Sequence, residues 1–425
     1  MRILRSVIAR GLTVAVIPAA AVAQIGLPAL PSVDVGSTLA SVDGLARLDH
    51  VPTAGVARAL ADARIARLAD FARRNRPEIE FDDDQNPAVR GILIVTGIDS
   101  TAIARADARG FKVIDRQAIE GLDLSFIRFS VPPGLALKAA RKTLAKLAPD
   151  AEIGVDHIYF PSGATSGPGA TSVPEASNSI ATPAIGMIDG GVAASLRLSG
   201  AIEQRGFAKG APRASAHGTA IASLISGRGP VRGAAPGAGL LAADVYGTAP
   251  TGGSATAIAR ALGWMAMRQV PVVTISLVGP DNPLLRAAVR AAQGKGILIV
   301  AAVGNDGPAA PPVYPASLSG VLAVTGTDAR ERVLPEAGRA LHVDFAAPAS
   351  DMKGAAPGGG VMPLRGTSFA APLVAARLSA HYHEARISGI EPAVRALMAE
   401  AKDLGKKGTD PVYGNGLVCG GCATR

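Results

Sequence analysis

The chain has few aromatic and few charged residues. Of its 425 residues, 4% are aromatic and 18% are charged, whereas 48% are hydrophobic and 50 are glycine. The formal net charge is +9, but the basic side chains are scattered, and no run of Lys or Arg is longer than the pair at 406–407. Without basic clusters interleaved with aromatic side chains, no nucleic-acid partner is expected. The composition favours a compact, loop-rich globular protein over a disordered or coiled-coil one.

Long apolar runs are also missing, since no stretch after residue 23 reaches the roughly 20 apolar residues that span a bilayer. The N-terminus has Arg2, Arg5 and Arg10, then an apolar stretch over 11–22, and Ala-Val-Ala at 21–23. This is the pattern of a secretory signal peptide. Residues 1–23 are therefore predicted to direct export to the periplasm or the medium, with no stable membrane anchor. An uncleaved anchor is the less favoured alternative.

Only two cysteines are present, Cys419 and Cys422. In an oxidising, exported setting, a small disulfide between them is the favoured state. A redox centre is disfavoured because the pair lies at the chain end, outside any βα turn. A zinc site that adds His381 and His383 is also disfavoured, since side chains two apart on a helix point to different faces.

Two segments of the N-terminal part are interpreted as linkers. Residues 24–87 have no assigned role and contain a predicted surface helix over 56–74, where apolar residues recur at helical spacing. The acidic run at 82–84 is interpreted as a solvated connector rather than a metal site, because no ligand spacing follows it. Residues 163–182 are rich in Gly, Ser, Thr and Pro, which indicates a flexible, cleavable linker.

Residues 88–162, between these linkers, alternate short strands with helices. The predicted strands are 89–97, 111–119, 124–131 and 153–160, and the predicted helices are 100–109 and 135–147. The order β-α-β-β-α-β is that of the ferredoxin-like module, a small α+β domain.

Residues 183–425 are predicted to form a second, α/β domain. Apolar strands are expected at 184–188, 240–245, 272–276, 297–303 and 321–326, and helices at 217–226, 254–267, 282–293, 368–383 and 391–400. Continuous apolar strands between helices favour a parallel sheet flanked by helices. Functional residues of such sheets gather where the strands end at their carboxyl side.

Three polar residues of this domain are candidates for catalysis. Asp189 ends an apolar strand, whereas His217 and Ser368 each open a helix, where free backbone N–H groups favour negative charge. A serine hydroxyl becomes a nucleophile when an imidazole takes its proton and a carboxylate orients that imidazole. We therefore predict that these three residues form a catalytic triad.

The motifs and their order, Asp, His, Ser, resemble those of the subtilases, which are subtilisin-like serine peptidases. Segments 185–191, 216–222 and 366–372 have the sequences Ile-Gly-Met-Ile-Asp-Gly-Gly, Ala-His-Gly-Thr-Ala-Ile-Ala and Gly-Thr-Ser-Phe-Ala-Ala-Pro. Gly190 stands where the family has Ser or Thr, and Phe369 where it usually has Met. An α/β-hydrolase esterase fits less well, because that fold has the order Ser, Asp, His and a Gly-x-Ser-x-Gly motif.

The resemblance also implies oxyanion and substrate-binding residues. Asn305 follows an apolar strand and would donate its side-chain amide to the oxyanion. The substrate backbone would pair with an edge segment by β-augmentation. This segment consists of Ser276, Leu277, Val278 and Gly279. The wall that faces it would include Ala302 and Gly304. Because Val278 stands where subtilases have Gly, a small or medium apolar residue is expected before the cleaved bond.

In this context the module 88–162 resembles a subtilase propeptide. The resemblance implies an exported serine endopeptidase that acts on proteins or peptides. It would be made as a zymogen, inhibited by its own propeptide and cleaved by itself between residues 160 and 179. The resemblance implies no catalytic cofactor, whereas structural calcium occurs in the family. The alternative is a catalytically inactive binding or inhibitor protein on the same fold, which the presence of all four catalytic residue types disfavours.

Overall fold

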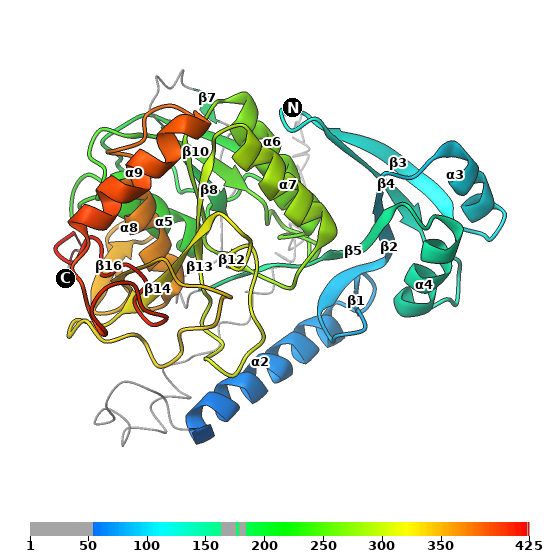
Figure 1. The fold of residues 1–425 in the computed structure, drawn as a ribbon, viewed down its shortest axis with the longest axis horizontal. Helices are drawn as coiled ribbons and strands as arrows, with labels where there is room; N and C mark the ends of the chain where they lie inside the picture. Colours follow the sequence, from blue (N-terminus) through cyan, green and yellow to red (C-terminus); the bar gives the residue numbers. More distant parts are fainter. Residues whose placement is uncertain (1–53, 163–175, 178–183, 423, 425) are drawn as a thin grey trace, which may run out of the picture.

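The computed structural model describes residues 54–162, 176–177, 184–422 and 424. The predicted signal peptide, residues 24–53 and most of the predicted linker 163–182 lie outside the described residues. Figure 1 shows a small α+β domain, formed by the N-terminal part of the chain, beside a larger α/β domain formed by the rest.

The N-terminal domain has the predicted ferredoxin-like arrangement. Its elements are β2 (Pro87–Thr96), α3 (Ser100–Asp107), β3 (Lys112–Ile119), β4 (Leu124–Ser130), α4 (Leu137–Leu147) and β5 (Glu152–His157). The strands pair antiparallel in the order β5-β2-β4-β3. Helices α3 and α4 pack on one face of this sheet, where Leu93, Phe129 and Leu144 share a core.

The end of the segment predicted as a linker belongs to this domain. Helix α2 (Ala54–Arg74) lies close to the predicted 56–74, but strand β1 (Ile79–Phe81) pairs antiparallel with the start of β2. Its three residues are too few to produce a periodic pattern. Within the acidic run, only Asp84 is exposed as a solvated connector would be. Asp82 accepts a hydrogen bond from His157, and Asp83 forms an ion pair with Arg141.

The C-terminal domain is built on a mainly parallel sheet. Its strands in this sheet are β7 (Ala176–Ser177), β8 (Ala184–Asp189), β9 (Ile202–Gly206), β10 (Gly239–Asp244), β11 (Val272–Ile275), β13 (Leu298–Ala302), β14 (Val321–Thr327) and β15 (Phe345–Pro348). The spatial order is β7-β9-β10-β8-β11-β13-β14-β15. Strand β7 pairs antiparallel with β9, and the other neighbours pair parallel.

Helices cover both faces of this sheet (Figure 1). The helices are α5 (Ala216–Ser226), α6 (Ala255–Met267), α7 (Pro283–Gly294), η2 (Thr367–Phe369), α8 (Ala370–Leu378) and α9 (Ile387–Glu400). Helices α5 and α8 share one core with the sheet, and α6 and α7 share the other. The remaining strands are short: β6 (Phe160–Pro161), β12 (Leu277–Val278), β16 (Met352–Ala355) and β17 (Val361–Leu364).

The two domains share a buried interface. Ile94 and Phe126 of the N-terminal sheet belong to the core of α6 and α7, whereas Leu93, next to Ile94 in β2, faces its own domain's core. Period-two alternation thus buries both faces of β2. Asn282, before α7, donates its amide to the carbonyl of Val155 at 2.9 Å. The end of β5 is therefore held against the larger domain.

We predict that Asp82 makes the stability of the N-terminal domain sensitive to acid. Burial alone would raise its pKa, but hydrogen bonds from His157 and Asn86 outweigh burial and lower the pKa to about 2. The unfolded-state pKa is about 3.9. The ionised carboxylate therefore stabilises the fold above pH 4, and this stabilisation is lost as the pH falls toward 2.

The measurement is urea unfolding followed by circular dichroism at pH 7, 4 and 3, in a Ser368→Ala background. Asp82→Asn is expected to flatten the fall in the unfolding midpoint below pH 4. Asp84→Asn, which changes an exposed neighbour, is the control and should leave the fall unchanged. Identical acid profiles of wild type and Asp82→Asn would contradict the prediction.

Candidate active site

Asp189 and His217 are brought together by the carboxyl end of β8 and the start of α5. The Nδ1 atom of His217 lies 2.9 Å from both carboxylate oxygens of Asp189, which is 1% exposed. The backbone N–H of Gly190 also donates to this carboxylate, at 2.7 Å. A Cβ on Gly218 would collide with the carbonyl of Gly190. Only glycine therefore lets α5 begin directly against the end of β8.

The presence of Gly190, where subtilases have Ser or Thr, has a local structural reason. Ser215 caps α5, and its hydroxyl accepts a hydrogen bond from Gly218 N–H at 2.9 Å. The same hydroxyl lies where a side chain on Gly190 would stand. A Ser or Thr at position 190 would therefore clash with the helix cap.

Ser368 lies in η2, just before α8, and is fully buried. The hydroxyl of Ser276 donates to its carbonyl at 2.8 Å, and the ring of Phe369 lies 5.3 Å from the ring of His217. Among the described residues, the Nε2 atom of His217 has no hydrogen-bond partner. The Ser368 hydroxyl instead accepts a hydrogen bond from Ser162 Oγ at 3.2 Å. The Ser368–His217 hydrogen bond of an active triad is thus not made in this structure.

Asn305 is oriented so that its amide nitrogen is available as a donor. Its Oδ1 accepts a hydrogen bond from the N–H of Thr367 at 2.9 Å, beside Ser368. Within the described part of the chain, its buried Nδ2 has no hydrogen-bond partner. The loop is held further by Gly304, whose carbonyl accepts from the hydroxyl of Thr367 at 3.1 Å. A buried donor without an acceptor is costly, and an oxyanion would satisfy it.

Residues 159–162 of the same chain lie along the edge formed by residues 276–278 beside Ser368, which we call the cleft edge. Strand β6 pairs antiparallel with β12, with Phe160 opposite Val278 and Pro161 opposite Leu277. This is strand addition to a free edge. The N–H of Ser162 donates to the carbonyl of Ser276 at 3.1 Å, and the Ser162 hydroxyl, with one proton to share, lies 3.2 Å from both this carbonyl and Ser368 Oγ.

The carbonyl of Ser162 points toward the nucleophile. It accepts a hydrogen bond from the backbone N–H of Ser368 at 3.4 Å. Ser162 belongs to no motif of the sequence. The available signal was its place at the junction between the ferredoxin-like module and the Gly/Ser-rich segment. That position does not tell which residue enters the cleft.

Tyr159 anchors this strand through its buried side chain, and no sequence motif indicates this role. Its side chain is 0% exposed, and its hydroxyl donates to the carbonyl of Pro280 at 2.7 Å. Its backbone N–H donates to the carbonyl of Gly253 at 2.8 Å. A Cβ on Gly279 would collide with the tyrosine ring. Burial raises the pKa of Tyr159 well above its ordinary value, so the phenol remains a donor.

The predicted facing wall is formed in part. The γ1 methyl group of Val278 lies 3.5 Å from the position that a Cβ on Gly304 would take. Val278 and Gly304, both predicted to bind the substrate, are therefore neighbours in the structure. Ala302 ends β13 and belongs to the core under the sheet. Its side chain packs with the core shared by α5 and α8.

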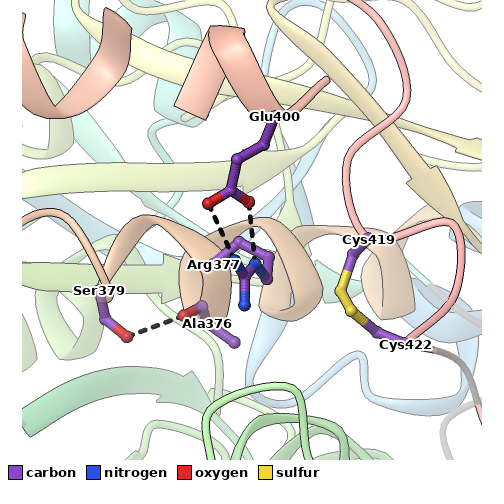
Figure 2. The surroundings of a disulfide bond; sticks show 6 residues. All are labelled: Ala376, Arg377, Ser379, Glu400, Cys419 and Cys422. Carbon is purple, nitrogen blue, oxygen red and sulfur yellow. Dashed lines mark hydrogen bonds and ion pairs between the residues drawn. A yellow bond between two sulfur atoms is a disulfide. The ribbon is translucent and has the colours of Figure 1, made fainter. Parts of the chain in front are cut away.

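The two cysteines are joined in a disulfide (Figure 2). Figure 2 shows it near α8, where Arg377 forms a two-point ion pair with Glu400. The Nε2 atom of His381 contacts the same Glu400 carboxylate.

Among the described residues, no group of three or more His, Cys, Asp or Glu side chains could hold a metal ion. In the same residues, no helix is long and apolar enough to cross a membrane.

Comparison with known proteins places this domain in a family. Residues 183–416, more than half of the chain, match the model of the subtilase family. M-protease of Shouchella clausii (strain KSM-K16) is 34% identical over 214 residues, 49% of this chain and 55% of that protein. Subtilisin Savinase of Lederbergia lenta is 34% identical over 214 residues, which cover 77% of its length. The chain belongs to the subtilase family, as its motifs predicted.

A solved structure supports the fold of more than this domain. Fervidolysin from Fervidobacterium pennivorans, a keratinolytic enzyme related to subtilisin, superposes with a TM-score of 0.62. The match is 19% identical and covers 80% of this chain and 61% of that one. The likeness is one of fold. Together with the sheet topology, it confirms the predicted subtilisin-like α/β fold.

We predict that Asn305→Ala lowers kcat by roughly 10²–10³ while KM changes little, because an oxyanion donor acts mainly in the transition state. The measurement is steady-state hydrolysis of a peptide substrate by the mature enzyme. An unchanged thermal unfolding midpoint would show that the fold is intact. A kcat equal to that of the wild type would contradict the assigned donor.

Proposed function

We propose that this chain is an exported serine endopeptidase that cleaves its own chain after Ser162 and is then held inactive by its N-terminal domain. One observation carries the proposal: the carbonyl of Ser162 accepts a hydrogen bond from the Ser368 N–H, while residues 160–161 pair with the cleft edge as a substrate would. Holding a peptide carbonyl beside a serine and an Asp–His pair removes much of the entropic barrier to acyl transfer.

The chemistry follows from the groups at this carbonyl. Asp189 accepts the Nδ1–H of His217 and holds the tautomer in which Nε2 is a base. For the reaction, the Ser368 hydroxyl leaves Ser162 Oγ and donates to Nε2, which takes the proton as the oxygen attacks the Ser162 carbonyl carbon. Catalytic hydrogen bonds are often long before the substrate is fully engaged.

The tetrahedral oxyanion then receives two donors, the Ser368 N–H and the Asn305 Nδ2. His217 gives its proton to the amine of residue 163, the C–N bond breaks, and an ester joins Ser162 to Ser368. Water, activated by His217, hydrolyses this ester and regenerates the serine. Peptide and protein substrates would use the same cleft after residues 159–162 leave.

The N-terminal domain is suited to inhibit the enzyme that it releases. Its sheet packs on α6 and α7, and its last residues fill the cleft edge. Cutting one peptide bond removes none of these contacts, so the cleaved domain remains bound as a competitive inhibitor. Export through residues 1–23 is supported by their basic, apolar and small-residue pattern.

Self-processing predicts that Ser368→Ala accumulates as the uncut chain, because no nucleophile attacks the 162–163 bond. The wild type should give a mature N-terminus at Gly163. N-terminal sequencing and intact mass of both proteins, expressed in a protease-deficient host, make the measurement. Normal maturation of the alanine variant would refute self-cleavage.

The narrow approach of Val278 to Gly304 predicts a preference for a small residue such as Ser or Ala before the cleaved bond. A peptide library, with cleavage positions identified by mass spectrometry, measures the profile of the mature enzyme. Val278→Gly should widen the pocket and raise kcat/KM for Leu or Phe at this position by about tenfold, the effect typical of a methylene or two in an apolar pocket. A wild-type profile dominated by Arg or Lys would contradict this assignment.

A catalytically inactive binding protein on this fold is the alternative. The Asp189–His217 pair, the aligned Ser162 carbonyl and an Asn305 Nδ2 without a partner among the described residues all favour the enzyme. A fluorophosphonate that labels wild-type Ser368, but neither the boiled protein nor Ser368→Ala, distinguishes the two.

A further inference from the structure

Helix α2 presents one continuous face to the rest of the molecule. Leu60, Arg64, Arg67 and Phe71 are spaced by four, three and four residues, which places them along one stripe of a helix. Leu60 and Phe71 are buried, although α2 lies outside the ferredoxin-like module. Figure 1 shows α2 extending from β1 toward the loops of the larger domain.

The middle of this stripe binds the loop that carries the oxyanion amide. Arg67 Nη2 lies 2.7 Å from Asp306 Oδ1, and Arg64 Nε lies 3.4 Å from Asp306 Oδ2. Asp306 directly follows Asn305, and its side chain is 11% exposed. Two guanidinium groups thus enclose one carboxylate. Because this carboxylate is largely removed from water, the ion pairs contribute more than an exposed surface pair does.

The apolar ends of the stripe make two further contacts. The δ1 carbon of Leu60 lies 2.9 Å from the position that a Cβ on Gly307 would take, so the glycine leaves room for the leucine. At the other end, the ring of Phe71 meets the ring of Phe160 edge to face, with centroids 5.1 Å apart. Phe160 is part of the strand in the cleft. Helix α2 therefore bridges the cleft strand and the oxyanion loop.

We propose that Asp306 and Gly307 form a docking site for a basic amphipathic helix, and that α2 occupies it. This basic-helix site is separate from the cleft edge and from the sheet interface on α6 and α7. Its partner needs an apolar residue followed by arginines four and seven positions later, as in α2. Binding of α2 at this site would retain the cleaved N-terminal domain more tightly and prolong the latency of the mature enzyme. This inference rests on the proposed function, because it presupposes the cleavage after Ser162.

The test uses the full chain with Arg67→Glu, and Arg58→Glu as a matched control on the same helix. Arg58 is exposed and lies off the stripe. Both changes are removed by cleavage after Ser162, so the mature enzymes are identical in sequence. After processing of the full chain, the lag before peptide hydrolysis begins and the rate at which the cleaved N-terminal part leaves the complex are measured. Arg67→Glu should shorten the lag and raise this rate by about 10-fold or more, as loss of a desolvated charge pair does.

A charge exchange separates the proposed contact from misfolding of the N-terminal domain. Combining Arg67→Glu with Asp306→Arg should restore at least part of the lag relative to Asp306→Arg alone. An unchanged lag in Arg67→Glu, or no restoration in the double variant, overturns the basic-helix site. If the wild type is neither cut nor labelled by fluorophosphonate, the proposed function fails instead. If the wild type is cut and labelled, but the Arg67→Glu variant has the same lag, only the docking site is rejected.

Discussion

The hydrogen bonds that hold residues 159–162 along the cleft edge are the constraint on which the remaining architecture depends. They join the end of one domain to the site of the other. Ser276 is central, because its carbonyl accepts a hydrogen bond from the N–H of Ser162 and its hydroxyl donates to the carbonyl of Ser368. One residue therefore sets the position of both the bound strand and the serine beside it.

The interface between the domains makes this alignment possible. A short strand alone would bind weakly, because ordering each residue costs about 1–2 kcal/mol of backbone entropy. The ferredoxin-like sheet reduces this entropy cost, because its packing on α6 and α7 already orders the chain next to the strand. Polar contacts refine the position: the buried Asp156 accepts a hydrogen bond from the N–H of Thr256 at 3.0 Å, near the start of α6. Tyr159, buried against Gly279, follows only a few residues further on.

The site also depends on small residues where backbones meet. Gly218 and Gly190 let the start of α5 press against the end of β8, which sets the distance between His217 and Asp189. Thr367 connects the serine segment to the Asn305 loop through its N–H and its hydroxyl. Such contacts show how a chain with few aromatic residues builds a closely packed site, since close backbone packing takes the place of large side chains.

Sequence patterns were informative where a strand or helix was long and regularly apolar. The strands that carry Asp189 and precede Asn305, and the helices opened by His217 and Ser368, lie near their predicted positions. Strand β9 was missed because its sequence, Ile-Glu-Gln-Arg-Gly, is mostly polar. Strand β15 was missed because its four residues end in proline. The helix predicted over 368–383 ends at Leu378, and its first turn is the 3₁₀ turn η2.

The amino-acid sequence by itself determined the family, the two-domain organisation and the identity of the candidate catalytic residues, because these depend on local motifs and on hydrophobic periodicity. Only the tertiary structure decided that Ser162 presents its carbonyl to Ser368, that Asp82 and His157 form a buried pair, and that α2 reaches Asp306. These contacts join residues 75 to 239 positions apart in the chain. Their formation depends on how two sheets and a helix pack together, which no local pattern specifies.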